Sequence, residues 1–122
     1  MAAVLTNLGE EWAAGCLAQT NALDGHFGHW GSGAGTAAKG DSALFTAESE
    51  ARIAGTVSLQ GSGAAAKWQN IFTLTAAGAK TITNAGCFDA LTLGNLLVHF
   101  DHGNIVLAIG DQIQYTVTLD PA

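Results

Sequence analysis

The stretch DQIQYTVTL at residues 111–119 restricts the possible fold more than any other part of the chain. Its hydrophobic and polar side chains alternate strictly, and the hydrophobic set is Ile113, Tyr115, Val117 and Leu119. A period of two is typical of a strand that buries one face and exposes the other. The chain is therefore expected to contain at least one sheet with a core on one side.

Other segments have the same period or are short apolar runs. ARIAGTVSLQ at residues 51–60 and WQNIFTLT at residues 68–75 alternate in the same way. Gly, Asn or Asp turn signals bound four shorter strand candidates: His26–Trp30, Lys80–Phe88, Asn95–Asp101 and Ile105–Ala108. We predict a mainly β fold, an antiparallel β-sandwich or jelly roll of about seven to eight strands. A chain of 122 residues is expected to form one domain, residues 1–122.

The N-terminal residues have a helical period instead. Spacings of three and four place one apolar stripe on a helix: Leu5, Leu8, Trp12 and Cys16. Asn7 followed three residues later by Glu10 has the form of a capping box. We therefore predict a short helix at about residues 8–19, with Leu5 and Trp12 packing on the domain or docking on a neighbouring molecule.

Charge and composition argue against two classes of partner. The formal net charge is −6 and only four residues are Lys or Arg, so we expect no nucleic-acid binding. No apolar run approaches the ~20 residues that span a bilayer, and no cationic signal follows Met1, so we expect no membrane contact and folding in a cytoplasm.

With 48% hydrophobic and 11% charged residues, the surface must be rich in small side chains. Such a surface favours contact with copies of the chain, as a dimer or trimer, or with a larger partner.

The four histidines lie in two similar stretches, HFGHW at residues 26–30 and HFDHG at residues 99–103. Residues three apart on a strand point to opposite faces, so the histidines of one stretch should not converge on a metal. A zinc site would need one histidine from each stretch together with Cys87, Asp101 or Asp24. We expect no metal and no cofactor.

A hydrolase site is the catalytic alternative. It would use Cys87 or a serine together with His99 and Asp101, which share one face of the expected strand. Asp101 could orient the imidazole, but the sequence contains no G-x-S-x-G nucleophile elbow. We therefore expect no catalytic residues and no enzyme activity.

Two carboxylates, Glu48 and Glu50, alternate with Arg52. Paired carboxylates can serve as general acid and base. We interpret this pair instead as a solvated strand face with an ion pair to Arg52.

Three tryptophans favour a carbohydrate-binding alternative, because aromatic faces stack on sugar rings. Each also has a structural explanation. Trp12 lies on the helical stripe, Trp68 begins an alternating strand, and Trp30 precedes a glycine-rich loop.

Four segments in order carry a resemblance to a known family: LTNLGEEW, HWGSGAGTAAKGDSALFTAESEARIAGT, AKTITNAGCFDALTLGNLL and LAIGDQIQYTVTL. Together they resemble small virion proteins of tailed bacteriophages. The resemblance implies a non-enzymatic component of the particle, a jelly-roll cement or decoration protein on the capsid exterior that bridges capsomers. It implies the major capsid protein as partner and synthesis in the bacterial host. Similar turns occur in tail-fibre and tail-tip proteins, so a tail component, with or without glycan binding, is the alternative.

Five residues are the candidates for contact with a partner in such a particle: Leu5, Trp12, Trp30, His99 and His102. Imidazoles are the side chains of this chain whose ordinary pKa lies near neutrality. The question that the sequence leaves open is whether protonating these histidines, by lowering the pH toward 5, loosens such a contact.

Overall fold

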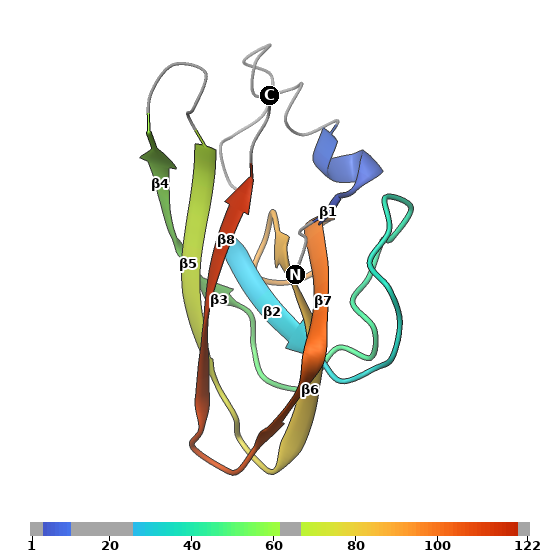
Figure 1. Cartoon of the computed structure of the whole chain (residues 1–122), viewed down its shortest axis with the longest axis vertical. Helices are drawn as coiled ribbons and strands as arrows, with labels where there is room; N and C mark the ends of the chain where they lie inside the picture. Colours follow the sequence, from blue (N-terminus) through green and yellow to red (C-terminus); the bar gives the residue numbers. More distant parts are fainter. Residues whose placement is uncertain (1–3, 11–25, 62–66, 120–122) are drawn as a thin grey trace.

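The fold is mainly β, as predicted. The computed structural model describes residues 4–10, 26–61 and 67–119, and within them the chain forms strands and one short helical segment at residues 7–10 (Figure 1). The strands are β1 Val4–Leu5, β2 Phe27–Gly31, β3 Ile53–Ala54, β4 Thr56–Gln60, β5 Lys67–Thr75, β6 Lys80–Phe88, β7 Leu96–Leu107 and β8 Gln112–Leu119. No helix in these described ranges is long and apolar enough to cross a bilayer.

The strands form two antiparallel sheets that lie face to face. One sheet has the order β1-β7-β6-β2-β3 and the other has the order β4-β5-β8. In Figure 1 the smaller sheet lies on the left and β6 and β7 of the larger sheet lie on the right. The prediction of an antiparallel sandwich is thus confirmed, whereas the narrower expectation of a jelly roll stays a prediction.

The centre of the sandwich is one long antiparallel hairpin that bends from one sheet into the other. Its first arm is β5 followed by β6, and its second arm is β7 followed by β8. At the bend the Ala76 N–H donates to the Asp111 carbonyl at 2.8 Å, and the Gly110 N–H donates to the Ala76 carbonyl at 2.8 Å. These bonds continue the antiparallel pairing across the bend. The pairing of β5 with β8 therefore runs on into the pairing of β6 with β7.

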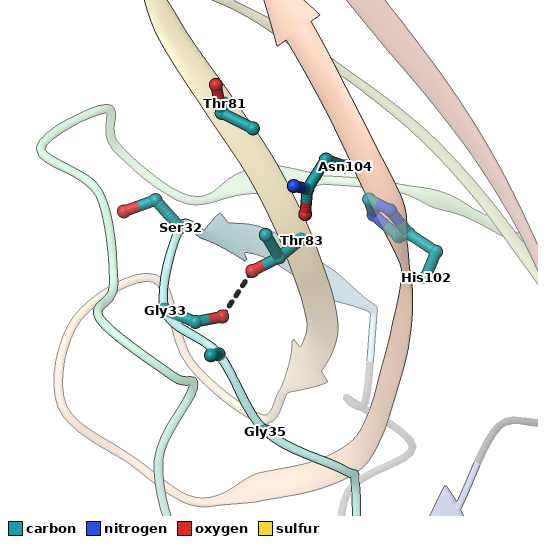
Figure 2. A pocket seen from close by; sticks show the side chains of 8 residues that line it. Ser32, Gly33, Gly35, Thr81, Thr83, His102 and Asn104 are labelled. Atoms are coloured by element: carbon teal, nitrogen blue, oxygen red, sulfur yellow. Dashed lines mark hydrogen bonds between the residues drawn. The ribbon is translucent and has the colours of Figure 1, made fainter.

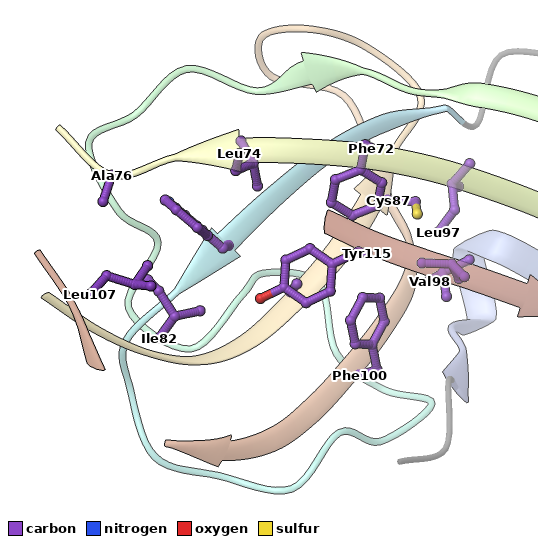
Figure 3. Packing of buried hydrophobic residues seen from close by; sticks show 13 residues of the cluster. Phe72, Leu74, Ala76, Ile82, Cys87, Leu97, Val98, Phe100, Leu107 and Tyr115 are labelled. Atoms are coloured by element: carbon purple, nitrogen blue, oxygen red, sulfur yellow. The ribbon is translucent and has the colours of Figure 1, made fainter. Parts of the chain in front are cut away.

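The core fills the space between the two sheets (Figure 3). The larger sheet contributes Trp30, Ile82 and Phe100, and the smaller sheet contributes Phe72 and Tyr115. The Tyr115 ring packs against those of Phe72 and Phe100, with centroids 5.3 and 5.4 Å apart. The alternation in DQIQYTVTL has this cause, because Tyr115 and Val117 point into the core while Gln114 and Thr116 are exposed.

Strand boundaries agree with the sequence where the period is clear and differ where a turn signal misleads. The predicted strand at 80–88 is β6, without change. The two candidates Asn95–Asp101 and Ile105–Ala108 are one continuous strand, β7. Gly103 and Asn104 resemble a turn, and they lie at an irregularity of the β6–β7 ladder, between the pairs Asn84–Asp101 and Ile82–Ile105, beyond which the strand continues.

The N-terminal prediction is partly wrong. Leu5 lies in β1, opposite Val98 of β7, and not on a helical stripe. The cap of the helical segment is Thr6 instead of Asn7, because the Gly9 N–H donates to the Thr6 hydroxyl at 3.0 Å. That hydroxyl in turn donates to the Leu96 carbonyl at 2.7 Å, which ties the start of the helix to β7. The predicted helix beyond residue 10, with Trp12 and Cys16, lies outside the described residues.

Candidate functional site

His99 is fully buried and joins β7 to the long segment that follows β2. Its Nδ1 lies 2.6 Å from Asp41 Oδ2, and its Nε2 lies 3.0 Å from Asn84 Oδ1. The Asn84 amide is fixed by the backbone of Phe45, because it accepts the Phe45 N–H and donates to the Phe45 carbonyl, each at 3.0 Å. Both ring nitrogens of His99 therefore face side-chain oxygen atoms of other segments.

Asp41 is the charged partner of this imidazole. Burial raises the pKa of the Asp41 carboxyl, but hydrogen bonds from the Ala38 N–H and from His99 outweigh burial and hold that pKa below its usual range. Asp101, two residues after His99, accepts the Ala37 N–H at 2.8 Å. The two aspartates thus fasten the glycine-rich segment onto the sandwich.

The other described histidines have separate surroundings. His29 Nε2 lies 2.6 Å from the Glu50 carbonyl, and burial lowers the pKa of His29. His102 Nε2 lies 2.9 Å from the Tyr115 hydroxyl, and burial raises the pKa of that phenol. His26 stacks on Phe27 with ring centroids 4.2 Å apart.

The side chains considered for zinc binding or hydrolysis do not act together. Cys87 is buried and contacts the Asn70 amide at 3.7 Å, and burial raises the pKa of its thiol to about 12. His99 is oriented by Asp41 instead of Asp101. Across residues 4–10, 26–61 and 67–119, no three His, Cys, Asp or Glu side chains are grouped so that they could hold a metal ion. Asp24 lies outside the described residues.

Glu48 and Glu50 do not form a solvated strand face, and their partner is Lys80 and not Arg52. Glu50 and Lys80 form an ion pair in which the side chains are 8% and 10% exposed, and Glu48 lies 3.2 Å from the same ammonium. Glu50 also accepts the Trp30 indole N–H and the Ala77 N–H, each at 2.9 Å. Burial raises the pKa of Glu50, but these hydrogen bonds, with that from Lys80 the largest, lower it to about 2.

A polar hollow of about 380 Å³ lies between the loop after β2 and strands β6 and β7 (Figure 2). Ser32, Gly33, Thr83 and His102 line it together with further small side chains. Most of its polar groups already have partners, since Thr83 donates to the Gly33 carbonyl, Ser32 donates to Glu48 at 2.8 Å and His102 contacts Tyr115. The hollow is therefore mainly a place where the loop is fastened to the sheet.

The predicted contact residues are mostly internal, which corrects the expectation drawn from the sequence. Trp30 and His99 are fully buried inside the chain, so neither side chain can face a partner in this fold. Leu5 is half-buried against the core, and His102 is half-buried at the hollow. Trp12 lies outside the described residues. The buried position of His99 also removes the reason to expect that protonating it loosens a contact between proteins.

The four most exposed large aliphatic side chains of the described residues lie instead in two places at opposite ends of β7. The first, which we call the loop cluster, consists of Leu91 and Leu93, 54% and 86% exposed, in the connection between β6 and β7. The second, the turn cluster, consists of Ile105, Val106 and Ile109 at the far end of β7 and in the turn to β8. Val106 and Ile109 are 79% and 75% exposed.

The loop cluster is held in a defined shape. Arg52 donates to the carbonyls of Ala90 and Leu93, and its guanidinium lies 3.6 Å from the centroid of the Phe88 ring. Asp89 accepts the Asn95 N–H at 2.7 Å across the base of the loop. The exposed leucines therefore lie on a preorganised loop, which lowers the entropy cost of binding.

The turn cluster is held similarly. Asp111 accepts the Ala108 N–H at 2.8 Å, and Gly110 adopts a φ of 88° that permits the tight turn. Large aliphatic side chains in or beside segments rich in Gly, Asn and Asp are the sequence signal for both clusters. The candidate functional site is thus a pair of rigid apolar contact surfaces.

Comparison of the chain with protein-family models, with curated proteins and with solved structures gave no significant match.

Proposed function

We propose that this protein is a non-enzymatic cement or decoration protein on the exterior of a bacteriophage capsid, where it bridges neighbouring capsomers. The observation that carries the proposal is the placement of the loop cluster and the turn cluster at opposite ends of β7. The resemblance of four sequence segments to small virion proteins supports the same role. The proposed partner is the major capsid protein.

Bridging requires two contact surfaces on one stiff body. At ~3.3 Å per residue, the 12 residues of β7 span on the order of 40 Å, so the two clusters can contact different subunits. The bent hairpin and the core between the two sheets keep the distance between the two clusters constant. Binding at each cluster removes its apolar surface from water, which stabilises the contact with the capsid subunit. Many such contacts together would make the shell harder to rupture.

The two clusters can be tested separately by co-sedimentation of purified protein with capsids that lack it. Leu93 has a φ of 58°, where glycine is favoured, so Leu93→Gly removes the exposed side chain without loss of fold stability. Val106→Thr keeps a β-branched residue on the strand and removes apolar surface. We expect each variant to bind at least about tenfold more weakly, because burying one such side chain contributes about 2 kcal/mol.

Ile53→Thr is the matched control, since Ile53 is an exposed aliphatic residue on β3, in neither cluster. It should bind like the unaltered protein. Failure of the unaltered protein to bind capsids, or equal binding of all three variants, contradicts the proposal.

The alternative is a tail or tail-fibre component. Copy number per particle separates the two roles, because a capsid protein follows the symmetry of the whole shell and a tail protein does not. Glycan binding through the tryptophans is less well supported, because Trp30 is buried and Trp68 is half-buried against the core.

A further inference from the structure

One edge of the smaller sheet has no strand partner within the described part of the chain. In the order β4-β5-β8, strand β8 pairs with β5 on one side only (Figure 1). That pairing runs from Trp68 opposite Leu119 to Thr75 opposite Gln112 without a register shift. The other side of β8 is therefore a regular edge of 8 residues.

The remaining sheet edges are shorter or interrupted. β1 and β3, at the two edges of the larger sheet, have 2 residues each. β4 has 5 residues and continues through Gly55 into β3 of the opposite sheet, so its edge turns away. β8 is the longest edge strand in the described structure.

β8 also lacks the features by which proteins protect an edge. Edge strands are usually blunted by charged side chains, by proline or by a bulge. The sequence QIQYTVTL contains no charged residue and no proline, and its ladder contains no bulge. The nearest charges in the sequence, Asp111 and Asp120, stand just outside the strand.

We propose that β8 pairs antiparallel with β8 of a second copy of this chain, forming one continuous six-stranded sheet across a two-fold axis. Antiparallel pairing of a strand with itself is isologous, so one sequence must complement itself. β8 does so, because its outward side chains are Gln and Thr, which can bond across the axis, and no like charges come to lie opposite each other.

The period of two restricts the register of this dimer. Outward residues must stay on the outward face of both copies, so an even-numbered residue must lie opposite an even-numbered one. Two central registers satisfy this rule: Thr116 opposite Thr116 of the second copy, or Thr116 opposite Gln114 of the second copy. Thr116 is exposed and lies next to the axis in both. The proposal does not depend on the capsid role.

Charge substitution at Thr116 tests the dimer. Light scattering after size exclusion should give the mass of two chains for the unaltered protein. Thr116→Lys alone and Thr116→Glu alone should each give one chain, because like charges then meet near the axis. An equal mixture of the two variants should restore the mass of two chains, since opposite charges meet in the mixed pair.

Thr56→Lys is the matched control, because Thr56 is exposed at the start of β4 on the other edge of the same sheet. It should remain a dimer. A monomeric unaltered protein, Thr116 variants that stay dimeric, or a mixture that stays monomeric while each variant keeps its circular dichroism spectrum overturns the proposal. Loss of the dimer in Thr56→Lys would place the contact at β4 and also overturn it.

Discussion

At the residue scale, buried polar side chains connect segments that are distant in the sequence. His99 contacts Asp41, 58 positions earlier, and Lys80 contacts Glu50, 30 positions earlier. Both partners lie in the segment between β2 and β3, which has little regular structure of its own. Such pairs position that segment at the cost of desolvating charges, so removing one partner should be more damaging than removing both.

Glu50→Gln should lower the free energy of unfolding at pH 7 by on the order of 3 kcal/mol, because Lys80 loses its more buried countercharge and keeps only Glu48, whose side chain is more exposed. The folded-state pKa of Glu50, about 2, lies below its ordinary value of 4.5. Its contribution is therefore fully present above about pH 4.5 and is lost as the pH falls toward 2. Urea unfolding at several pH values should show a smaller acid dependence in the variant.

Glu10→Gln is the control for that experiment. Glu10 pairs with Lys39 at 2.5 Å, but both side chains are about half exposed. An exposed pair contributes less than about 1 kcal/mol. Equal losses in the two variants would contradict the assignment of Glu50 to a buried pair.

Asp41→Ala should destabilise the protein by on the order of 2 kcal/mol, because it leaves a buried N–H of His99 without an acceptor. Asp41→Asn keeps an oxygen at that position and should cost less. Thermal unfolding at pH 7 measures both. Equal losses of stability in Asp41→Asn and Asp41→Ala would contradict the role of Asp41 as the acceptor for His99.

None of these pairs could be predicted from the sequence. Local spacing placed Asp101 beside His99 and Arg52 beside Glu50, whereas the fold supplies Asp41 and Lys80. The fully buried position of His99 was missed for the same reason, since alternation on one strand says nothing about a loop that covers its outer face.

At the element scale, the sequence predicts strands well where hydrophobic periodicity is strong. β8 follows directly from it, β5 differs by the addition of Lys67, and β6 matches a candidate that was bounded by turn signals. Prediction fails where tertiary pairing decides the local structure. Leu5 lies in β1 because it pairs with Val98 of β7, and residues 103–104 remain part of β7 because the pairing with β6 resumes at Ile105.

Thr6→Val tests the junction between β1 and the helical segment. It removes a hydroxyl that accepts the Gly9 N–H and donates to the Leu96 carbonyl, so it should cost on the order of 1–2 kcal/mol. Thr6→Ser keeps the hydroxyl and should recover most of that loss in urea unfolding. A serine variant as unstable as the valine variant would assign the effect to packing and not to the cap.

At the scale of the whole molecule, the sandwich is a stiff spacer with apolar residues at both ends of β7 and an unprotected edge on β8. Composition predicted a surface suited to protein contacts, but not where the contacts lie. Four of the five residues selected from the sequence were aromatic or imidazole side chains, and the fold buries two of them, Trp30 and His99, while aliphatic residues in or beside the turns are left exposed.

The central proposal is that this chain covers a bacteriophage capsid, and the most direct test is its copy number in intact particles of the phage proposed to carry it, measured by quantitative gel electrophoresis against the major capsid protein. A decoration protein should be present at a fixed ratio of copies to the major capsid protein, and at on the order of hundreds of copies per particle, because its sites repeat with the symmetry of the shell. A few copies, or a few dozen, would contradict it and assign the protein to the tail.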